Sequence, residues 1–243
     1  MKQTPGYKII KAWLASKQFK PFPFQEEAWS EIARGNSGLV NAPTGFGKTF
    51  SVFLGALINF INDNPKDYKT KKKNGLQLLW ITPLRALGKD IARAMEEVID
   101  ELGMQWQVGI RNGDTDINER ARQKRNVPEA LIITPESLHL LLAQKGYKET
   151  FATLKLIAVD EWHELLGSKR GVQVELAVSK LVALQNAKCK IGNVKDKDNQ
   201  SLKSRNHHLQ LWGISATIGN LEQAKDVLLA PLPKFLLPTN AAR

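Results

Sequence analysis

The stretch VNAPTGFGKT, residues 40–49, decides the fold of this chain. It follows a short apolar run that starts at Gly38, and a pattern with helical spacing continues after it from Phe50 to about Ile61. A strand, a glycine-containing turn and a helix in this order form the setting that a phosphate-binding loop needs. The backbone N–H groups of such a turn, together with the N-terminus of the next helix, attract a polyphosphate.

Each residue type in this loop suits one task. Gly45 and Gly47 let the backbone approach the phosphates closely. Lys48 can reach the terminal phosphates, and the Thr49 hydroxyl suits Mg²⁺. A surface loop could carry the same letters by chance, but the strand and the helix on either side argue against that alternative.

Composition limits the class of protein. The 243 residues are 42% hydrophobic, which is enough to bury a core, and no apolar run has the length of a membrane span. The N-terminus lacks the apolar segment of a signal peptide, and a single cysteine, Cys189, excludes an internal disulfide and a cysteine-based zinc site. We therefore expect a cytoplasmic, nucleoid-associated protein with no membrane partner. The net charge of +11 favours nucleic acid as a partner, although charge that serves only solubility is an alternative.

Strands and helices alternate along the remaining sequence. Apolar runs typical of buried parallel strands lie at 38–40, 76–81, 105–110, 130–133, 154–159 and 209–214. Helical patterns lie at 7–17, 25–33, 50–61, 83–102, 116–125, 135–143, 171–183 and 221–229. The alternation predicts an α/β fold with a mostly parallel sheet, helices on both faces and the motifs at the carboxyl ends of the strands.

Two polar segments interrupt this pattern. Residues 62–74 are rich in lysine, and residues 188–208 are polar and basic, so we expect exposed loops at both places. His207 and His208 are adjacent and would point to opposite faces of a strand, so we do not expect them to bind a metal. The prolines from residue 231 onwards indicate the start of a linker.

Two of the predicted strands end in the same Thr-Pro pair at the start of a helix. Thr82 suits the N-cap and Pro83 the first helical position, with Arg85 nearby, and Thr134 repeats the arrangement. Capping alone would explain either pair. Two helix N-termini at one sheet edge would also present donors to one polyanion, and we favour this interpretation because the pair occurs twice.

A pair of acids follows the strand predicted at 154–159. Asp160 would hold Mg²⁺, and Glu161 would orient and deprotonate the attacking water. A solvated strand end or a helix cap is the alternative. In a chain that already has a phosphate loop, paired acids after a buried strand favour the metal site. At the end of the last strand, Ser215 and Thr217 could bridge to a neighbouring domain or simply cap a turn.

The motifs occur in the order Gln25, APTGFGKT, TPLRAL, TPESL, DEWH and SAT. This set resembles the first motor domain of superfamily 2 DExH-box helicases, in which the phosphate loop also begins with alanine. DEWHEL followed by KRG, and SATIGN, look like the Lhr (large helicase-related) group. The opening FPFQEEAW is similar to the bacterial, ligase-associated branch of that group.

The resemblance implies a RecA-like P-loop NTPase fold and two such domains with ATP between them. We then expect an N-terminal helical segment at 1–34, the first RecA-like domain at 35–230, and at 231–243 the start of a linker to a second one. Such a protein would couple Mg-ATP hydrolysis to 3′-to-5′ movement on single-stranded or partly duplex DNA, in DNA repair, with a DNA ligase or repair nuclease as candidate partner. Residues 1–243 alone would be only weakly active, because an arginine from a facing domain completes the γ-phosphate site.

Roles for individual residues follow from the same resemblance. ATP would be bound by Gln25, which reads adenine, and by Thr44, Gly45, Phe46, Gly47, Lys48 and Thr49. Lys48, Asp160 and Glu161 would be catalytic, with Mg²⁺ on Thr49 and Asp160. Coupling to DNA movement would involve His163, Ser215 and Thr217, and contacts to the DNA backbone would involve Thr82, Arg85, Thr134 and Ser137.

Two alternatives remain open from the sequence. An RNA helicase or remodeller would carry the same motifs, because they mostly contact phosphate. A non-catalytic nucleic-acid-binding module that retains a nucleotide pocket is the other alternative. Intact Lys48, Asp160 and Glu161 argue against it.

Overall fold

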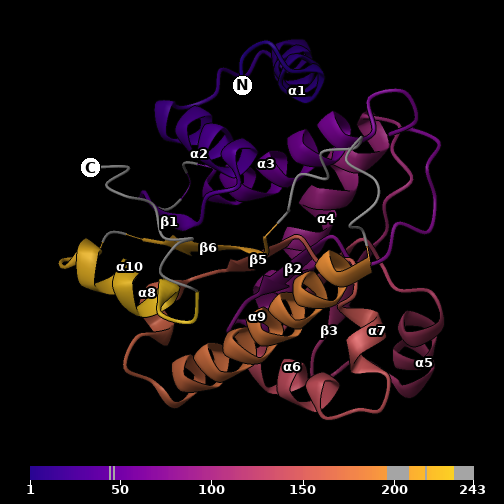
Figure 1. Cartoon of the computed structure of the whole chain (residues 1–243). Coiled ribbons are helices and arrows are strands. Elements are labelled where there is room, and N and C mark those ends of the chain that lie inside the picture. The colour runs from indigo at the N-terminus through magenta and orange to yellow at the C-terminus, as the bar shows by residue number, and fades with distance from the viewer. Residues whose placement is uncertain (44, 46, 196–207, 217, 233–243) are drawn as a thin grey trace.

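A parallel sheet forms the centre of the chain in the computed structural model, which describes residues 1–43, 45, 47–195, 208–216 and 218–232 (Figure 1). Within that part of the chain the sheet has six strands in the order β1-β6-β5-β2-β4-β3. Their bounds are β1 Gly38–Asn41, β2 Leu78–Ile81, β3 Val108–Arg111, β4 Ala130–Ile133, β5 Leu156–Val159 and β6 Gln210–Ser215. The predicted α/β fold is confirmed.

Helices cover both faces of the sheet (Figure 1). One core lies under α1 Pro5–Ser16, α2 Pro23–Arg34, α3 Lys48–Asp63 and α4 Arg85–Glu101. The other lies under α6 Pro135–Leu142, α8 Trp162–Leu165, α9 Lys169–Lys195 and α10 Leu221–Leu229. Two further helices of the described residues are α5 Ile117–Arg125 and the short α7 Tyr147–Thr150. None of the described helices combines the length and apolar content needed to cross a bilayer.

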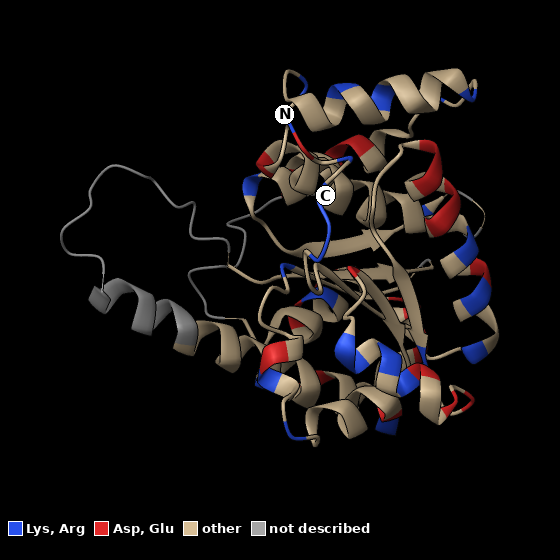
Figure 2. Cartoon of the chain, turned by 90° about the vertical axis from the view of Figure 1, so that its right-hand side faces the viewer, with Lys and Arg blue, Asp and Glu red and all other residues tan. Residues whose placement is uncertain are grey.

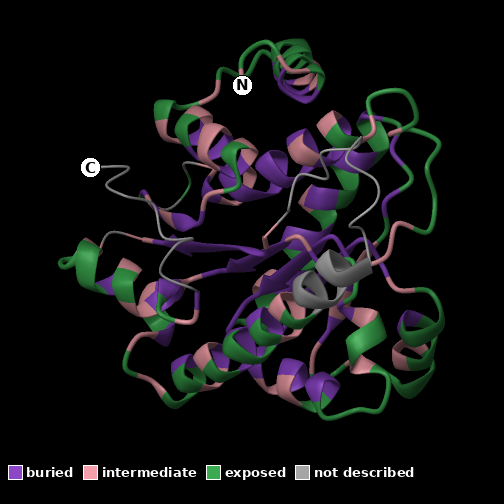
Figure 3. Cartoon of the chain, in the orientation of Figure 1, coloured by how far each residue is buried: buried purple, intermediate pink, exposed green. Residues whose placement is uncertain are grey.

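Side chains of the central strands alternate between the two cores. In β2, Leu78 and Trp80 face the core under α1 to α4, whereas Leu79 and Ile81 face the other core. All four are buried, and Figure 3 shows the central strands buried along their length. Burial on both faces explains why the strand sequences are continuous apolar runs rather than alternating ones.

The register of the sheet brings distant motifs to one edge. Asn41 at the end of β1 lies beside Ser215 at the end of β6, and Val159 of β5 lies beside Gly213 of β6. On its other side Val159 pairs with Ile81 at the end of β2. The carboxyl ends of the strands therefore line up, and the residues that follow them gather at the same edge.

The predicted N-cap at Thr82 is wrong. Helix α4 begins at Arg85 with Leu84 as its N-cap residue, so Pro83 is not the first helical position either. The Thr82 N–H donates to the carbonyl oxygen of Ile133 at 3.0 Å and continues the sheet ladder past the strand end. At the second Thr-Pro pair, Thr134 does cap α6, because its hydroxyl accepts from the Ser137 N–H.

The predicted exposed loop at 188–208 is wrong for its first part, since α9 continues to Lys195. The stretch beyond Ala183 contains no proline and several lysines, which are good helix formers. Residues 196–207 lie outside the described residues, as does most of the predicted linker at 231–243.

Helix α1 packs closely on α3 at Gly6. A Cβ atom at this position would lie 2.4 Å from the carbonyl oxygen of Ile58, which is shorter than any normal contact. The Gly6 N–H also donates to Oδ1 of Asn62 at 2.9 Å. The contact between the two helices therefore depends on the missing side chain.

We predict that Gly6→Ala lowers the free energy of unfolding by about 1–3 kcal/mol. The new methyl group would clash with the backbone of α3, which cannot move aside as a flexible side chain could. Gly219→Ala is the matched control, since a Cβ atom there would meet nothing within 4 Å. Urea denaturation of both variants measures the difference. Equal stability of the two variants would contradict the close approach.

Candidate nucleotide-binding site

The loop between β1 and α3 has the backbone of a phosphate-binding turn. Gly45 has φ +83° and Gly47 φ +70°, a left-handed conformation that suits glycine. Gly47 is the N-cap residue of α3, and no side-chain cap hydrogen bond forms there. The Phe50 N–H donates to the Gly47 carbonyl oxygen at 3.1 Å, whereas the N–H groups of Lys48 and Thr49 have no backbone partner among the described residues and are available to a ligand. Thr44 and Phe46, which were predicted to bind ATP, lie outside the described residues.

Lys48 is the first residue of α3 and is buried, with 8% of its surface exposed. Its Nζ is shielded from solvent and has no hydrogen-bond partner among the described residues. A buried ammonium without a partner is strongly unfavourable unless an anion reaches it. The terminal phosphates of a nucleotide on the loop would supply that anion.

Asp160 follows β5 and is also buried, with 5% of its surface exposed. Burial, and then the charge of the neighbouring Glu161, raise the pKa of Asp160 to about 6. Hydrogen bonds from the Trp80 indole (3.4 Å) and the Glu161 N–H (3.0 Å) act in the opposite direction, as does the charge of Lys48. A cation beside this carboxylate would remove the unfavourable part of its burial.

Glu161 has a strained backbone. Its φ and ψ are both +46°, in the left-handed region that residues other than glycine rarely adopt. Strain of this kind is of the order of 1–3 kcal/mol and concentrates at functional sites. The turn starts α8 immediately after Asp160, so both acids stay at the strand end.

His163 connects Glu161 with the end of β6. Its Nδ1 lies 3.1 Å from Ser215 Oγ, 3.4 Å from the Ala216 nitrogen and 3.4 Å from Glu161 Oε2. The Ala216 N–H can only donate and the Glu161 carboxylate can only accept, so Nδ1 faces groups with opposite requirements, while Nε2 lies 3.5 Å from Glu164 Oε1. Two of the predicted coupling residues, His163 and Ser215, are thus in contact, whereas Thr217 lies outside the described residues.

Gln25 lies against the phosphate loop although it precedes it by a whole helix. Its Oε1 accepts from the Phe22 N–H, and its Nε2 donates to the Gly47 carbonyl oxygen, both at 2.9 Å. An amide nitrogen carries two hydrogens and the amide oxygen two lone pairs, so one donor and one acceptor remain. That pair matches what the edge of a base requires.

The donor set fits Mg²⁺. The described residues contain no group of three or more His, Cys, Asp or Glu side chains that could hold a metal by themselves. Mg²⁺ commonly takes only one or two protein ligands and completes its shell with phosphate oxygens and water. Asp160 and the half-buried Thr49 are hard oxygen donors of this kind.

The residues predicted to contact DNA lie at the ends of the neighbouring strands β2 and β4. Thr134 and Ser137 are buried, and their hydroxyls bond to each other at 3.2 Å. Thr82 is buried too, and its hydroxyl has no partner among the described residues. Of the four residues, Arg85 has the accessible side chain, 54% exposed and 3.4 Å from Asp114.

Sequence reasoning missed Arg170. Its Nε donates to Glu136 at 2.7 Å and its Nη1 to the Pro83 carbonyl oxygen at 3.4 Å, so it ties together the two Thr-Pro turns. The KRG triplet was visible in the sequence, but its partners were not. Figure 2 shows Lys and Arg interspersed with Asp and Glu on several helices, so the net positive charge does not by itself mark a binding stripe.

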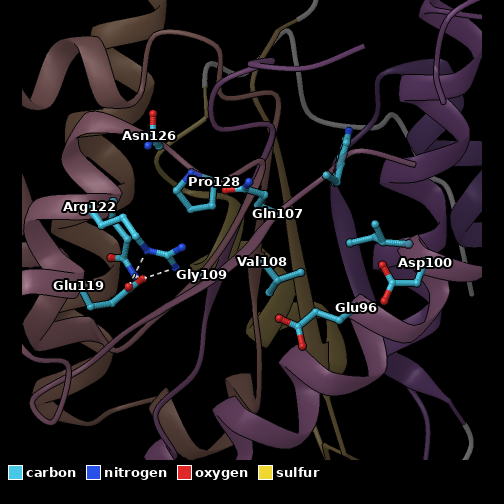
Figure 4. A pocket seen from close by; sticks show the side chains of 12 residues that line it. Glu96, Asp100, Gln107, Val108, Gly109, Glu119, Arg122, Asn126 and Pro128 are labelled. Atoms are coloured by element: carbon cyan, nitrogen blue, oxygen red, sulfur yellow. Dashed lines mark hydrogen bonds and ion pairs between the residues drawn. The ribbon is translucent and has the colours of Figure 1, made fainter. Parts of the chain in front are cut away.

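A separate pocket lies between α4, β3 and α5 (Figure 4). Its volume is 420 Å³, and its lining includes the acids Glu96, Asp100 and Glu119. Arg122, also in the lining, is already paired with Glu119 at 2.7 Å. The excess of carboxylates disfavours a polyphosphate there, so the loop before α3 is the better nucleotide site.

Comparisons with known proteins show what this chain is similar to. The DEAD/DEAH box helicase family model matches residues 22–225. The Lhr helicase/uracil glycosylase of Escherichia coli (strain K12) is 36% identical over 183 residues, which are 71% of this chain and 12% of that protein. An ATP-dependent helicase Lhr-Core of Sulfolobus acidocaldarius is 32% identical over 227 residues, which are 90% of this chain and 23% of that protein.

Solved structures give the same result. The helicase Lhr of Mycobacterium smegmatis bound to ssDNA and AMP-PNP superposes with a TM-score of 0.67 at 31% identity, covering 90% of this chain and 25% of that one. The DEAD-box helicase Mss116 bound to ssRNA and UDP-BeF has the same TM-score of 0.67 at 19% identity, and so shares the fold. The predicted RecA-like fold is confirmed, and the chain spans a quarter or less of the Lhr proteins compared here.

We predict that Asp160→Asn stabilises the metal-free chain at pH 7 by up to about 3 kcal/mol. The pKa of Asp160 is about 6 in the folded chain against an ordinary value of 3.8, so the unfolded chain loses this proton first. Stability therefore falls as pH rises from about 4 through 6, and the variant avoids this loss.

Urea denaturation in EDTA at pH 4.5 and 7.5 checks the prediction. The stability gain of Asp160→Asn should grow between these two values. Asp90→Asn, an exposed position on α4, is the control and should show no such gain. A variant less stable than the unaltered chain at pH 7.5 would contradict the stated cause of the shift.

Proposed function

The chain belongs to the DEAD/DEAH box helicase family, and from that premise we propose that it is the nucleotide-binding motor domain of a DNA helicase. In this proposal it couples Mg-ATP hydrolysis to movement along single-stranded DNA. The observation that carries the proposal is the buried Nζ of Lys48, which lacks a partner among the described residues at the edge where Asp160 is also buried. The same edge carries Glu161 and His163.

Each side chain would act on a different part of the nucleotide. Lys48 would bind the terminal phosphates, the N–H groups at the start of α3 would bind the others, and Gln25 would contact the base. Thr49 and Asp160 would hold Mg²⁺, which neutralises charge on the phosphate oxygens. Phosphoryl transfer of this kind rests mainly on positioning and electrostatics, so these contacts would supply part of what the reaction needs, and an arginine from a facing domain would complete the γ-phosphate site.

Glu161 would orient the attacking water and accept its proton. The contact between Glu161 and His163 at 3.4 Å, and that between His163 and Ser215 at 3.1 Å, would then relate the state of the γ-phosphate to the end of β6. Thr217 would belong to the same connection. This contact chain runs across the sheet edge without leaving it.

DNA is favoured over RNA by one relative. The M. smegmatis Lhr structure, 31% identical, holds ssDNA and AMP-PNP, a strand and a nucleotide analogue of the kinds proposed here. Residues Thr82, Arg85, Thr134 and Ser137 and their backbone would contact phosphates, with Arg85 as the accessible cation. A role in repair, the ligase-associated branch, a nuclease or ligase partner and a second RecA-like domain are part of the proposal.

Two substitutions separate binding from hydrolysis. We predict that Lys48→Ala weakens Mg-ATP binding by roughly 10- to 100-fold, because a charge-assisted bond to the terminal phosphates is lost. Glu161→Gln should leave binding within about twofold and impair turnover in the full-length enzyme, because water positioning is lost while the phosphate contacts stay. Titration with a fluorescent ATP analogue measures binding, and steady-state assays measure turnover.

Lys89→Ala, at an exposed position on α4, is the control and should change neither quantity. Equal loss of binding in Lys48→Ala and Glu161→Gln would contradict the roles proposed for these two residues.

Binding of single-stranded DNA should depend on salt and little on sequence. With about three phosphates neutralised, log affinity should fall with log salt at a slope near −2. Arg85→Ala should reduce the magnitude of that slope by about 0.7, whereas Arg93→Ala, further along α4, should not. Fluorescence anisotropy across a salt series gives the slopes. An affinity that does not change with salt concentration, or a strong preference for one DNA sequence, would exclude the proposed contacts to the DNA phosphates.

A further inference from the structure

Strand β2 contacts Asp160 in two ways. The Asp160 N–H donates to the Ile81 carbonyl oxygen at 2.8 Å, which continues the ladder between β2 and β5. The indole Nε1–H of Trp80 donates to Asp160 Oδ2 at 3.4 Å, between two fully or nearly fully buried side chains. The first contact holds the backbone of Asp160, and the second holds its carboxylate.

Trp80 differs from the other buried tryptophans of the described chain in the partner of its indole, whereas the partly exposed Trp13 donates to Glu101 at 2.7 Å. Three other buried tryptophans, Trp29, Trp162 and Trp212, donate their indole N–H to backbone carbonyl oxygens. Among the buried tryptophans that the structure describes, Trp80 is the one whose indole donates to a carboxylate. An indole N–H is a donor only, so this bond places a positive hydrogen on one chosen oxygen of Asp160.

The two oxygens of Asp160 are held by different donors. Oδ1 accepts from the Glu161 N–H at 3.0 Å, and Oδ2 accepts from Trp80. One donor on each oxygen fixes the plane of the carboxylate, and each oxygen keeps a free lone pair. Metal ligands are commonly oriented by such outer partners, whose loss weakens metal binding by about 10- to 100-fold.

We propose that Trp80 is a positioning residue that orients the Asp160 carboxylate for the Mg²⁺ of the bound nucleotide. This inference rests on the proposed function, because it assumes that Asp160 receives the metal. Trp80 itself touches neither nucleotide nor metal in this account. Its neighbour in β5 is the small Ala158, beside which the indole lies on the same face of the sheet as α3.

The test uses Trp80→Phe, which keeps an aromatic ring and removes the N–H. Binding of a fluorescent ATP analogue is titrated with Mg²⁺ and, separately, in EDTA. We expect the Mg²⁺ concentration at half-saturation to rise about tenfold, while affinity in EDTA stays within about twofold. Trp212→Phe is the matched control, because that indole is buried in β6 and donates to the Asn36 carbonyl oxygen at 3.0 Å.

A double-mutant cycle separates positioning from packing. If Trp80 acts through Asp160, Trp80→Phe should have no further effect on Mg²⁺ dependence in the Asp160→Asn background. The inference would be overturned if Trp80→Phe still changed the Mg²⁺ dependence in the Asp160→Asn background, or if Trp212→Phe changed it by the same factor. A loss of analogue affinity in EDTA as large as the loss in Mg²⁺ would overturn it too. If the unaltered chain bound the analogue equally well with and without Mg²⁺, the proposed function would be contradicted as well. Failure of the inference alone can therefore be told apart from failure of the proposed function.

A second measurement uses the unaltered chain, so it does not depend on whether the Trp80→Phe variant folds. The indole N–H resonance of Trp80 in the unaltered chain should shift when Mg²⁺ and the analogue are added together, and shift less when the analogue is added in EDTA. The Trp212 resonance is the internal reference and should stay in place. Equal shifts with and without Mg²⁺ would overturn the inference even if Trp80→Phe did not fold.

Discussion

Two buried groups of opposite charge lie at one edge of the sheet, and each needs a partner to offset the cost of its burial. The ammonium of Lys48 has no partner among the described residues, and burial raises the pKa of Asp160 to about 6. The charge of Lys48 favours the ionised carboxylate, yet burial outweighs it. A phosphate on Lys48 and a cation on Asp160 would satisfy both groups at once, as the proposed Mg-ATP would do.

The parallel sheet brings these groups together from distant parts of the chain. Strands β1, β6 and β5 are neighbours although they begin at Gly38, Gln210 and Leu156. Strand β2 lies on the other side of β5, holds Asp160 through Ile81 and Trp80, and continues into the turn with Arg85. The same strand thus contacts Asp160, the proposed metal ligand, and leads to Arg85, the accessible cation proposed for nucleic acid.

Much of the fold and site could be predicted because the features are local in sequence. Continuous apolar runs predicted all six strands of the described chain, and α10 began and ended where expected. Thr82 and Thr134 looked alike, and the N–H of each donates to a neighbouring strand, but the Thr134 hydroxyl caps α6 whereas α4 begins only at Arg85, with Leu84 as its N-cap residue. Trp80 depends on the register between β2 and β5, and Arg170 depends on packing across α9 and α6, so neither contact could be predicted from sequence.

A crystal structure of the chain with Mg²⁺ and a non-hydrolysable ATP analogue tests the central claim most directly. We predict that Nζ of Lys48 lies within hydrogen-bond distance of a terminal phosphate oxygen, and that the carboxylate of Asp160 lies in the first or second shell of the metal. The N–H groups at the start of α3 should contact the remaining phosphates. A nucleotide bound elsewhere, with Lys48 still buried and unpartnered, would contradict the account.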